Sequence, residues 1–225
     1  MENPVGKKNR NSVVKIWSKI LNYLAVKEKL QATLDKIQTN RDGSPVTNVK
    51  LSPGLVAEIE QITKELEGLN PNLYPLVHSP QLLQGTWRLL YSTAREIRSL
   101  DSLPLGLKVG QVYQAIDVGS KSFFNLAFVK HPLGLVSGYV KVTATFEPVK
   151  VNGSPLPDKR INVYFDKCSS SIQKLLGFPT PKLDPVNVVQ ARSPQGRTPC
   201  LDITYLDENF RIGWGGDGSW ILWKI

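Results

Sequence analysis

The strongest constraint on the fold is a series of strand-like segments that begins at Gly85-Thr86-Trp87 and runs to the C-terminal end of the sequence. Apolar and polar residues alternate in these segments, as they do in half-buried β-strands. The segments are 86–92, 111–118, 122–130, 138–147, 160–166, 185–191, 200–206, 209–213 and 219–225. Their short connections favour an antiparallel meander, and the last segment can pair with the first. We therefore predict a mainly β protein, an antiparallel β-barrel of eight or nine strands, with an open sandwich as the alternative.

The sequence before residue 85 predicts helices instead. From Val13 to about Ile37 apolar residues recur at steps of three and four, which indicates an amphipathic helix, and Lys27 inside that stripe predicts a break or a change of partner. A second helix begins at the N-cap Ser52 and stops at Gly68. Three parts are expected: residues 1–12 as a flexible basic tail, 13–84 as a pair of amphipathic helices packed on the barrel, and 85–225 as the barrel.

The net charge of +9 and the pI near 9.5 favour a polyanionic partner. Residues 1–29 hold seven basic and two acidic side chains, so the first helix is expected either on an anionic membrane surface or packed on the barrel. Nucleic acid is a poor candidate because no strand interleaves basic and aromatic residues. No apolar run approaches the ~20 residues of a membrane span, and the N-terminus lacks the order of a signal peptide, which predicts a cytoplasmic protein.

The start of the strand region and its central segments suggest a floor and a wall. Gly85 allows a left-handed backbone and the Trp87 indole closes a narrow bore, although the same pair also fits a core strand of a sandwich. The expected wall consists of Phe124, Leu126, Phe128, Val140, Val142, Ala144 and Phe146. Because segment 122–130 is apolar on both faces, we expect the N-terminal helices to cover it. A bore of about eight strands is either filled by side chains or wide enough for one small apolar ligand.

The connections between the strands differ at the two ends of a meander. Those after the first, third and fifth strands share an end and are rich in leucine, whereas those at the other end, 119–121, 151–155 and 192–197, are mostly polar. The expected apolar rim consists of Leu103, Leu105, Leu107, Leu133, Leu135, Leu176 and Phe178. Exposed apolar patches usually mark an interaction site, so we predict a mouth here and a floor at the Trp87 end. The alternative is that these side chains fold inward as plugs.

The residues of familiar catalytic sites are missing from the sequence. Only His78 and His131 are present, neither in a spacing that suits a zinc site or a Ser-His-Asp triad. Asp207 and Glu208 are adjacent at an expected turn, where paired acids are usually solvated. The glycine-rich run 213–218 leads into a strand rather than a helix, which favours a turn over a phosphate site. We therefore expect a protein that is not an enzyme and has no metal or other cofactor.

Several short motifs occur together in a characteristic order. They are Leu69-Asn70-Pro71, Gly85-Thr86-Trp87-Arg88-Leu89-Leu90-Tyr91-Ser92, Gln111-Val112-Tyr113-Gln114 with Asn125, segment 142–148, and Tyr205-Leu206-Asp207-Glu208-Asn209-Phe210-Arg211-Ile212. This set resembles the plastid lipid-associated protein, or fibrillin, family over roughly residue 15 to the C-terminus. The resemblance implies a lipocalin-like barrel in which Gly85 and Trp87 match the Gly-x-Trp signature and Arg211 packs over the indole. Trp214 stands where the family often has a second arginine.

The resemblance also implies a function. The family is associated with thylakoids and lipid droplets and is implied to bind or organise carotenoids, prenylquinones and other lipids. We therefore expect non-enzymatic binding of such an apolar molecule in the barrel, with peripheral association to thylakoid membrane or lipid bodies. The alternative is an interaction protein that supports a membrane-associated prenyl synthase and has a packed bore. The absence of a transit-like leader resembles a cyanobacterial member.

Overall fold

The computed structural model describes residues 4–39, 42–150, 159–191, 198–216 and 218–225. The polar connections 151–155 and 192–197 lie outside the described residues. The N-terminal part holds α1 (Pro4–Gln38), β1 (Val46–Thr47), η1 (Asn48–Lys50), α2 (Pro53–Gly68), α3 (Pro75–His78) and η2 (Pro80–Leu83). Among the described residues, none of the helices combines the length and the apolar character that crossing a membrane requires.

The described residues after η2 lie mainly in β-strands. The strands are β2 (Gly85–Ser92), β3 (Lys108–Asp117), β4 (Ser122–Lys130), β5 (Val136–Pro148), β6 (Arg160–Leu175), β7 (Phe178–Pro179), β8 (Asn187–Gln190), β9 (Cys200–Leu206), β10 (Phe210–Gly215) and β11 (Gly218–Lys224). Short helical turns occupy two connections: α4 (Arg95–Ser99), η3 (Leu100–Ser102) and η4 (Pro104–Gly106) before β3, and η5 (Pro181–Leu183) before β8. Each predicted strand segment is thus present, with boundaries shifted by a few residues except in β6, which is nine residues longer than segment 160–166.

The sheet closes on itself. Among the described residues, β2 pairs with β11 on one side and with β3 on the other, and the order β2-β11-β10-β9-β6-β5-β4-β3 returns to β2. We call these eight strands the ring. The closure confirms the predicted mainly β, antiparallel fold and excludes the open sandwich. Segment 185–191 is not part of the ring, because among the described strands β8 pairs with β6 alone.

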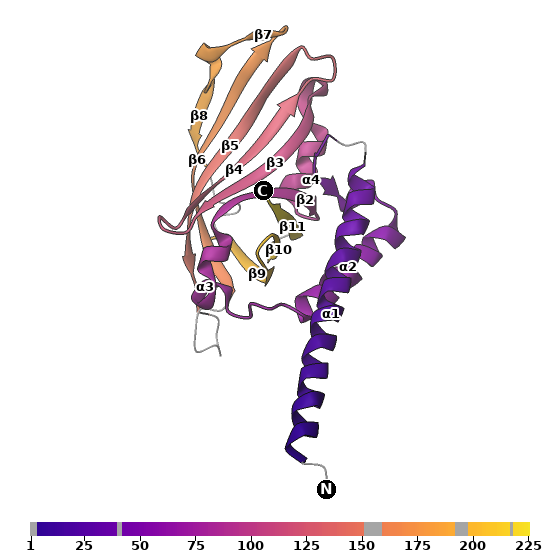
Figure 1. Ribbon diagram of the computed structural model, residues 1–225. Helices are drawn as coiled ribbons and strands as arrows, with labels where there is room; N and C mark the ends of the chain where they lie inside the picture. The colour runs from indigo at the N-terminus through magenta and orange to yellow at the C-terminus, as the bar shows by residue number, and fades with distance from the viewer. Residues whose placement is uncertain (1–3, 40–41, 151–158, 192–197, 217) are drawn as a thin grey trace.

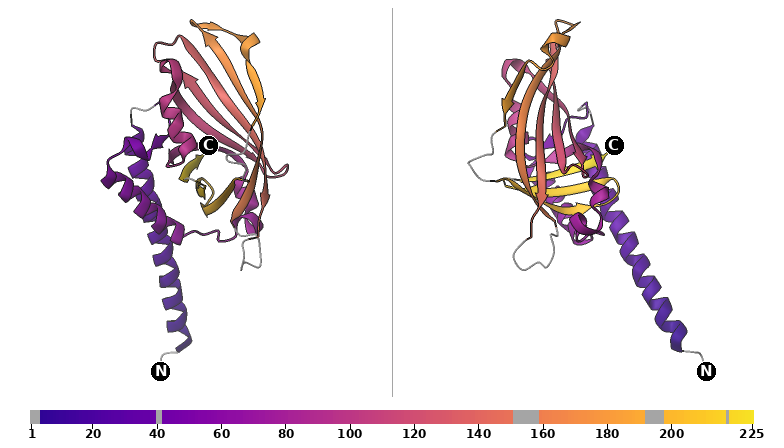
Figure 2. Two further views of the ribbon diagram at one scale, coloured as in Figure 1. Left: turned by 180° about the vertical axis from the view of Figure 1, so that it is seen from behind. Right: turned by 90° about the vertical axis from the view of Figure 1, so that its left-hand side faces the viewer.

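The ring is complete at one end and open at the other. Residues 160–162 of β6 pair with β9, but residues 167–170 pair with β8 and residues 174–175 with β7. The long strands β3 to β6 therefore continue past β9, β10 and β11 as a tall, curved sheet (Figures 1 and 2). This extension explains why β6 is longer than its alternation predicted: its second half leaves the ring and finds other partners. The concave side of the sheet is left open toward that end.

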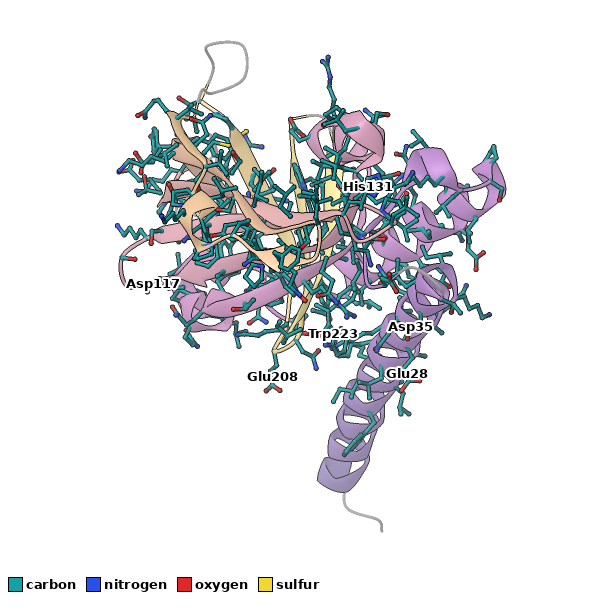
Figure 3. The ribbon with its side chains drawn as sticks, turned by 90° about the horizontal axis from the view of Figure 1, so that it is seen from above. Glu28, Asp35, Asp117, His131, Glu208 and Trp223 are labelled. Carbon is teal, nitrogen blue, oxygen red and sulfur yellow. The ribbon has the colours of Figure 1, made fainter. Side chains whose placement is uncertain are left out.

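Two apolar cores lie on the two sides of the ring wall. The inner core is centred on the fully buried Trp87. The outer core joins α1 and α2 to the outer face of β2, β9, β10 and β11 through Leu30, Leu34, Ile59, Ile62, Leu66, Tyr91, Tyr205, Phe210, Ile212 and Ile221. Figure 3 shows Trp223 of β11 between the ring and α1. The helices thus pack on the sheet as predicted, but on these strands, so the expectation that they cover β4 is wrong.

The first helix behaves differently in its two halves. It begins at Pro4, so residues 4–12, expected as a flexible tail, are helical. The helix is not broken at Lys27. Instead, Nζ of Lys27 lies 2.5 Å from Oδ2 of Asp207, which is the predicted change of partner. The C-terminal half packs on the ring, whereas the N-terminal half extends away from it with Trp17 60% and Leu21 63% exposed (Figures 1 and 2). We call the exposed residues Trp17, Ile20, Leu21 and Leu24 the free half of α1; the neighbouring Tyr23 instead bonds to Asp207.

Candidate functional site

The strand register separates the predicted wall residues onto two faces. Residues paired across neighbouring strands share a face, and the pairs are Phe123 with Ala144, Asn125 with Val142 and Ala127 with Val140. Val140, Val142, Ala144 and Phe146 therefore face the interior. Phe124, Leu126 and Phe128 point to the outer face, so their placement in the wall is wrong. The inward-facing and the outward-facing residues of β4 are both apolar enough to be buried, so alternation alone did not distinguish the two faces.

The outer residues of β4 are covered by their own neighbours. The Phe128 ring packs edge-on against Tyr113 at 6.1 Å and against Tyr139 at 6.3 Å between ring centroids. The Lys141 ammonium lies 4.3 Å from the centroid of the Phe124 ring, and its alkyl stem shields more apolar surface. These contacts leave Phe124, Leu126 and Phe128 only partly exposed. Neighbouring aromatic side chains and Lys141 therefore cover the outer face of β4, which the helices were expected to cover.

The interior changes character from the closed end of the ring to the open end. Near the closed end Phe123, Ala144 and Phe146 are buried in the inner core. Further along the same strands Ala127, Val140 and Val142 face inward but keep part of their surface accessible. Side chains therefore fill the base of the interior and leave its upper part accessible.

The closed end holds the predicted floor. Trp87 is fully buried, its Nε1 donates to the Leu83 carbonyl oxygen at 2.9 Å, and Cζ of Arg211 lies 4.8 Å from the ring centroid. Gly85 has φ +114°, and a Cβ there would lie 3.1 Å from Cε of Lys224. The Lys224 ammonium in turn lies 5.2 Å from the Trp87 ring. The structure thus brings Gly85, Trp87 and Arg211 together, and adds Lys224, which the sequence did not single out.

A line of polar side chains leads from this floor toward the accessible interior. Nη2 of Arg211, a residue 3% exposed, donates to Oε1 of Gln114, and Nε2 of Gln114 donates to Oδ1 of Asn125 at 2.9 Å. Burial lowers the pKa of Arg211 to about 9. Burial, and then the nearby charge of Arg211, also lower the pKa of Lys224. The signal for Gln114 was available in the sequence: it is a polar residue on the inner face between Val112 and Ile116.

The leucine-rich connections meet at the open end. A Cβ at Gly106 would lie 3.7 Å from Nε2 of His131, and the backbone N–H of Leu176 donates to the Leu135 carbonyl oxygen at 2.6 Å. The exposed members of this rim are Leu105 at 87%, Leu133 at 77%, Phe178 at 72%, Leu176 at 66% and Leu135 at 40%. Leu103 and Leu107 are half-buried. The plug alternative is therefore wrong for the exposed members, which point into solvent.

Two of the rim leucines hold an unusual backbone conformation. Leu105 has φ +57° and Leu176 has φ +52°, in the left-handed region that costs a residue with a Cβ roughly 1–2 kcal/mol. Asparagine or glycine would relieve that cost at an exposed turn. Lys108, Lys174 and Lys182 are exposed on the segments that form or flank the rim. Strained, exposed leucines beside lysines are typical of a surface selected for contact rather than for stability.

Asp207 is the clearest error of the sequence interpretation. It is 7% exposed rather than solvated, and its Oδ2 accepts from Lys27 at 2.5 Å, Tyr205 at 2.6 Å and Tyr23 at 2.7 Å. Its Oδ1 accepts the backbone N–H groups of Asn209 and Phe210. Burial raises the pKa of this carboxyl, but these hydrogen bonds outweigh burial and hold the pKa below its usual value. Asp207 thus fixes α1 to the β9–β10 turn.

A pocket of about 450 Å³ lies elsewhere, on the outer side of β9 and β10. It is lined by Thr93, Arg160, Cys200, Asp202, Trp214, Gly215, Gly216 and Gly218. Trp214 donates its indole N–H to Oε1 of Glu67 on α2, which identifies this side of β10 as the outer face. None of the predicted site residues borders this pocket, and it is separate from the interior of the ring.

A closed antiparallel sheet with a tryptophan floor, a partly accessible interior and an apolar rim places the chain in the class of β proteins whose strands close into a ring. The family model PAP_fibrillin matches residues 25–223. The chain therefore belongs to the PAP_fibrillin family, as the motifs suggested.

Three chloroplastic proteins illustrate the relatives of this chain. Plastid-lipid-associated protein 6 of Arabidopsis thaliana is 33% identical over 187 residues, which cover 75% of this chain and 63% of the relative. Plastid lipid-associated protein 3 of Brassica campestris is 30% identical over 201 residues, with coverage of 74% and 53%. Plastoglobulin-1 of Pisum sativum is 29% identical over 195 residues, also with coverage of 74% and 53%. The chain thus spans between about half and two thirds of their length. No solved structure matches it significantly.

Proposed function

We propose that this protein binds an apolar small molecule, a carotenoid, a prenylquinone or another lipid, inside the ring, and performs no catalysis on it. In this proposal the rim rests on the surface of a thylakoid membrane or a lipid body, and the ligand passes between that surface and the interior. The observation that carries the proposal is the accessible interior directly below an exposed apolar rim. The names of two relatives, plastid-lipid-associated protein 6 of Arabidopsis thaliana and plastid lipid-associated protein 3 of Brassica campestris, support the same class of function.

The physical chemistry of the rim suits a lipid surface. Full burial of a leucine or phenylalanine side chain contributes about 1.5–3 kcal/mol, so the side chains of Leu105, Leu133, Leu176 and Phe178 together offset much of the cost of ordering a protein at a surface. Each lysine close to anionic head groups adds about 1 kcal/mol. Neither contribution requires a membrane-spanning helix.

The rim is tested with the double variant Leu133→Ser/Phe178→Ser in co-sedimentation with vesicles that contain an anionic phospholipid. We expect at least a tenfold loss of the bound fraction relative to the unaltered protein. Leu73→Ser is the matched control, because Leu73 is 71% exposed but lies in the connector between α2 and α3. Equal loss in both variants, or none in either, contradicts a membrane role for the rim.

The interior is tested separately by filling it. Val142→Phe places a larger side chain on the inner face of β5, whereas Thr145→Phe adds the same group to its exposed outer face. If the ligand occupies the interior, extraction and mass spectrometry of co-purified lipids will show a strong decrease for Val142→Phe and none for Thr145→Phe. Unchanged lipid content in Val142→Phe would refute binding inside the ring.

The free half of α1 favours a second candidate function. It extends from the end of the molecule opposite the rim, so a molecule whose rim lies on a membrane presents Trp17, Leu21 and Leu24 away from that membrane (Figures 1 and 2). We propose this surface as a docking site for a protein partner such as a prenyl synthase. Removal of residues 1–40 is a poor test, because Leu30 and Leu34 belong to the outer core.

Trp17→Ser/Leu21→Ser is the sharper variant, since it alters the free half alone. Capture of a purified prenyl synthase on the immobilised protein is expected to fall at least fivefold in this variant. The rim variant Leu133→Ser/Phe178→Ser should leave capture unchanged. Capture that depends on the rim, or on neither surface, would exclude docking through α1.

A further inference from the structure

The floor of the ring contains a buried positive charge without a negative partner. Arg211 is 3% exposed, and among the described residues its polar contact is a hydrogen bond that it donates to Gln114. Ion pairs among the described residues include those of Lys27 with Asp207, Lys130 with Asp42 and Arg160 with Asp202. Arg211 takes part in none of them. Buried guanidinium groups are normally paired, because an isolated charge in an apolar interior is costly.

A second cation makes the imbalance larger. The ammonium of Lys224 lies 5.2 Å from the centroid of the same Trp87 ring that Arg211 contacts at 4.8 Å. This ammonium donates a hydrogen bond to a neutral acceptor, the carbonyl oxygen of Leu82, at 2.9 Å. The indole face attracts both cations, but it carries no net charge and offsets only part of the repulsion between them. The floor therefore concentrates positive charge at the base of the interior.

The unused donors of Arg211 lie below the accessible part of the ring. A guanidinium has five N–H donors, and the bond to Gln114 uses one of them. Gln114 leads to Asn125, which is only partly buried and pairs across the sheet with Val142. Polar groups thus line the base, and apolar side chains, Ala127, Val140 and Val142, line the space above it. This order, from charged base to apolar mouth, matches an amphiphile that enters head first.

We propose that the floor is an oxyanion subsite and that the preferred ligand is a long-chain amphiphile with a carboxylate or phosphate head. The head accepts hydrogen bonds from the Arg211 guanidinium, and the apolar tail extends past Val140 and Val142 toward the rim. The planar fork of arginine suits two oxygens of one head group, and an oxyanion also neutralises the charge that the fold leaves unpaired. The inference rests on the proposed function, because it needs a ligand in the ring, and it narrows that ligand to acidic lipids.

Four ligands with the same chain length test the inference on the unaltered full chain. Palmitate and hexadecyl phosphate carry an oxyanion head, whereas hexadecanol and methyl palmitate are neutral. Their dissociation constants are measured by competition with a fluorescent fatty-chain probe, below the concentrations at which the ligands aggregate. We expect one or both oxyanions to bind at least tenfold more tightly than the neutral pair. The palmitate and phosphate arms distinguish the two head groups.

Arginine variants test whether the preference for oxyanion ligands depends on Arg211. Arg211→Gln should reduce the preference for the oxyanions to less than threefold, whereas Arg95→Gln, which alters an exposed arginine on α4, should leave it intact. Arg211→Lys keeps the charge and is expected to keep part of the preference if Arg211→Gln fails to fold. Equal affinity for all four ligands in the unaltered protein overturns the subsite but leaves lipid binding in place. Binding of none of them also overturns the subsite, and if no lipid co-purifies with the unaltered protein either, the proposed function itself is refuted.

Discussion

At the scale of single residues, the floor depends on a glycine that no other residue can replace without strain. Gly85 has φ +114°, and Lys224 packs where its side chain would lie. The sequence singled out the Gly85 and Trp87 pair because a tight backbone and a large indole suit a narrowing interior. The structure explains why the two residues occur together: because Gly85 has no side chain, Lys224 can lie over the Trp87 ring.

Gly85→Ala is therefore expected to lower the free energy of unfolding by about 1–2 kcal/mol, because alanine is strained at positive φ and displaces Lys224. Urea unfolding followed by tryptophan fluorescence measures the change. Gly54→Ala is the matched control, since a Cβ at that position on α2 meets no atom within 4 Å. The control should be neutral or slightly stabilising, and equal destabilisation in both variants would contradict this account of Gly85.

Asp207 gives the protein a defined acid sensitivity. Its carboxylate is held by Lys27, Tyr23 and Tyr205, and its folded-state pKa lies below the usual value. A group with a lowered folded-state pKa contributes stability above its unfolded pKa of about 4, and that contribution is lost as the pH falls through the lower folded value.

We expect Asp207→Asn to lower the free energy of unfolding by roughly 2–3 kcal/mol at neutral pH, since it leaves Lys27 with an unpaired, largely buried charge. The variant should also lose less of its remaining stability than the unaltered protein between pH 5 and pH 2. Denaturant unfolding at several pH values measures both effects. Parallel pH profiles for the two proteins would show that Asp207 is not a source of the acid sensitivity.

At the scale of elements, α1 is one continuous helix with a packed C-terminal part and an exposed N-terminal part. The periodicity of its apolar residues predicted the helix, but a helix stripe does not reveal which part of it meets a core. The structure divides it at the Lys27–Asp207 pair: Leu30 and Leu34 are fully buried, whereas Leu21 is 63% exposed.

Leu30→Ala is expected to lower the free energy of unfolding by about 2–5 kcal/mol, as for other fully buried leucines. Leu21→Ala removes the same atoms from the free half and should change stability by less than about 0.5 kcal/mol. Thermal or denaturant unfolding of the two variants measures the difference. A large effect of Leu21→Ala would mean that the free half packs on the ring in solution.

β4 shows the limit of sequence patterns at the same scale. In a strand with one apolar face, the sequence indicates which face is buried. In β4, however, Phe124 and Phe128 alternate with Phe123 and Ala127, so both faces are apolar. The pairing with β5 settled the choice and placed Phe124 outside. The orientation of β4 is fixed by its partner β5, because Ala144 and Phe146 of β5 are buried in the inner core.

At the scale of the whole molecule, the rim and the free half of α1 lie at opposite ends (Figure 1). A single flat membrane cannot contact both, although the basic charge of the N-terminal residues and the apolar rim each suit a lipid surface. The two surfaces therefore belong to different partners in the proposed function, with lipid at the rim and protein at the helix.

The positive charge near the rim predicts how rim binding responds to salt. Because Lys108, Lys174 and Lys182 are exposed on the segments that form or flank the rim, association with anionic vesicles should weaken several-fold between 0.1 and 1 M salt, as the screening length falls from about 10 Å to about 3 Å. Binding to neutral vesicles, which depends on the rim leucines, should change little. Co-sedimentation across this range measures both, and a salt-independent affinity for anionic vesicles would remove the electrostatic contribution.

The sequence by itself determined the strand segments, the two helices, the pairing of Gly85 with Trp87 and the segregation of leucines to one set of connections. These features follow from local periodicity and from the rule that successive connections of a meander lie at alternate ends of the sheet. Only the tertiary structure decided which face of β4 is inside, that β8 lies outside the ring, that Asp207 is buried, and that Arg211 lies at the base of the interior without a carboxylate. Each of these depends on residues far apart in the chain, and local patterns carry no information about such neighbours.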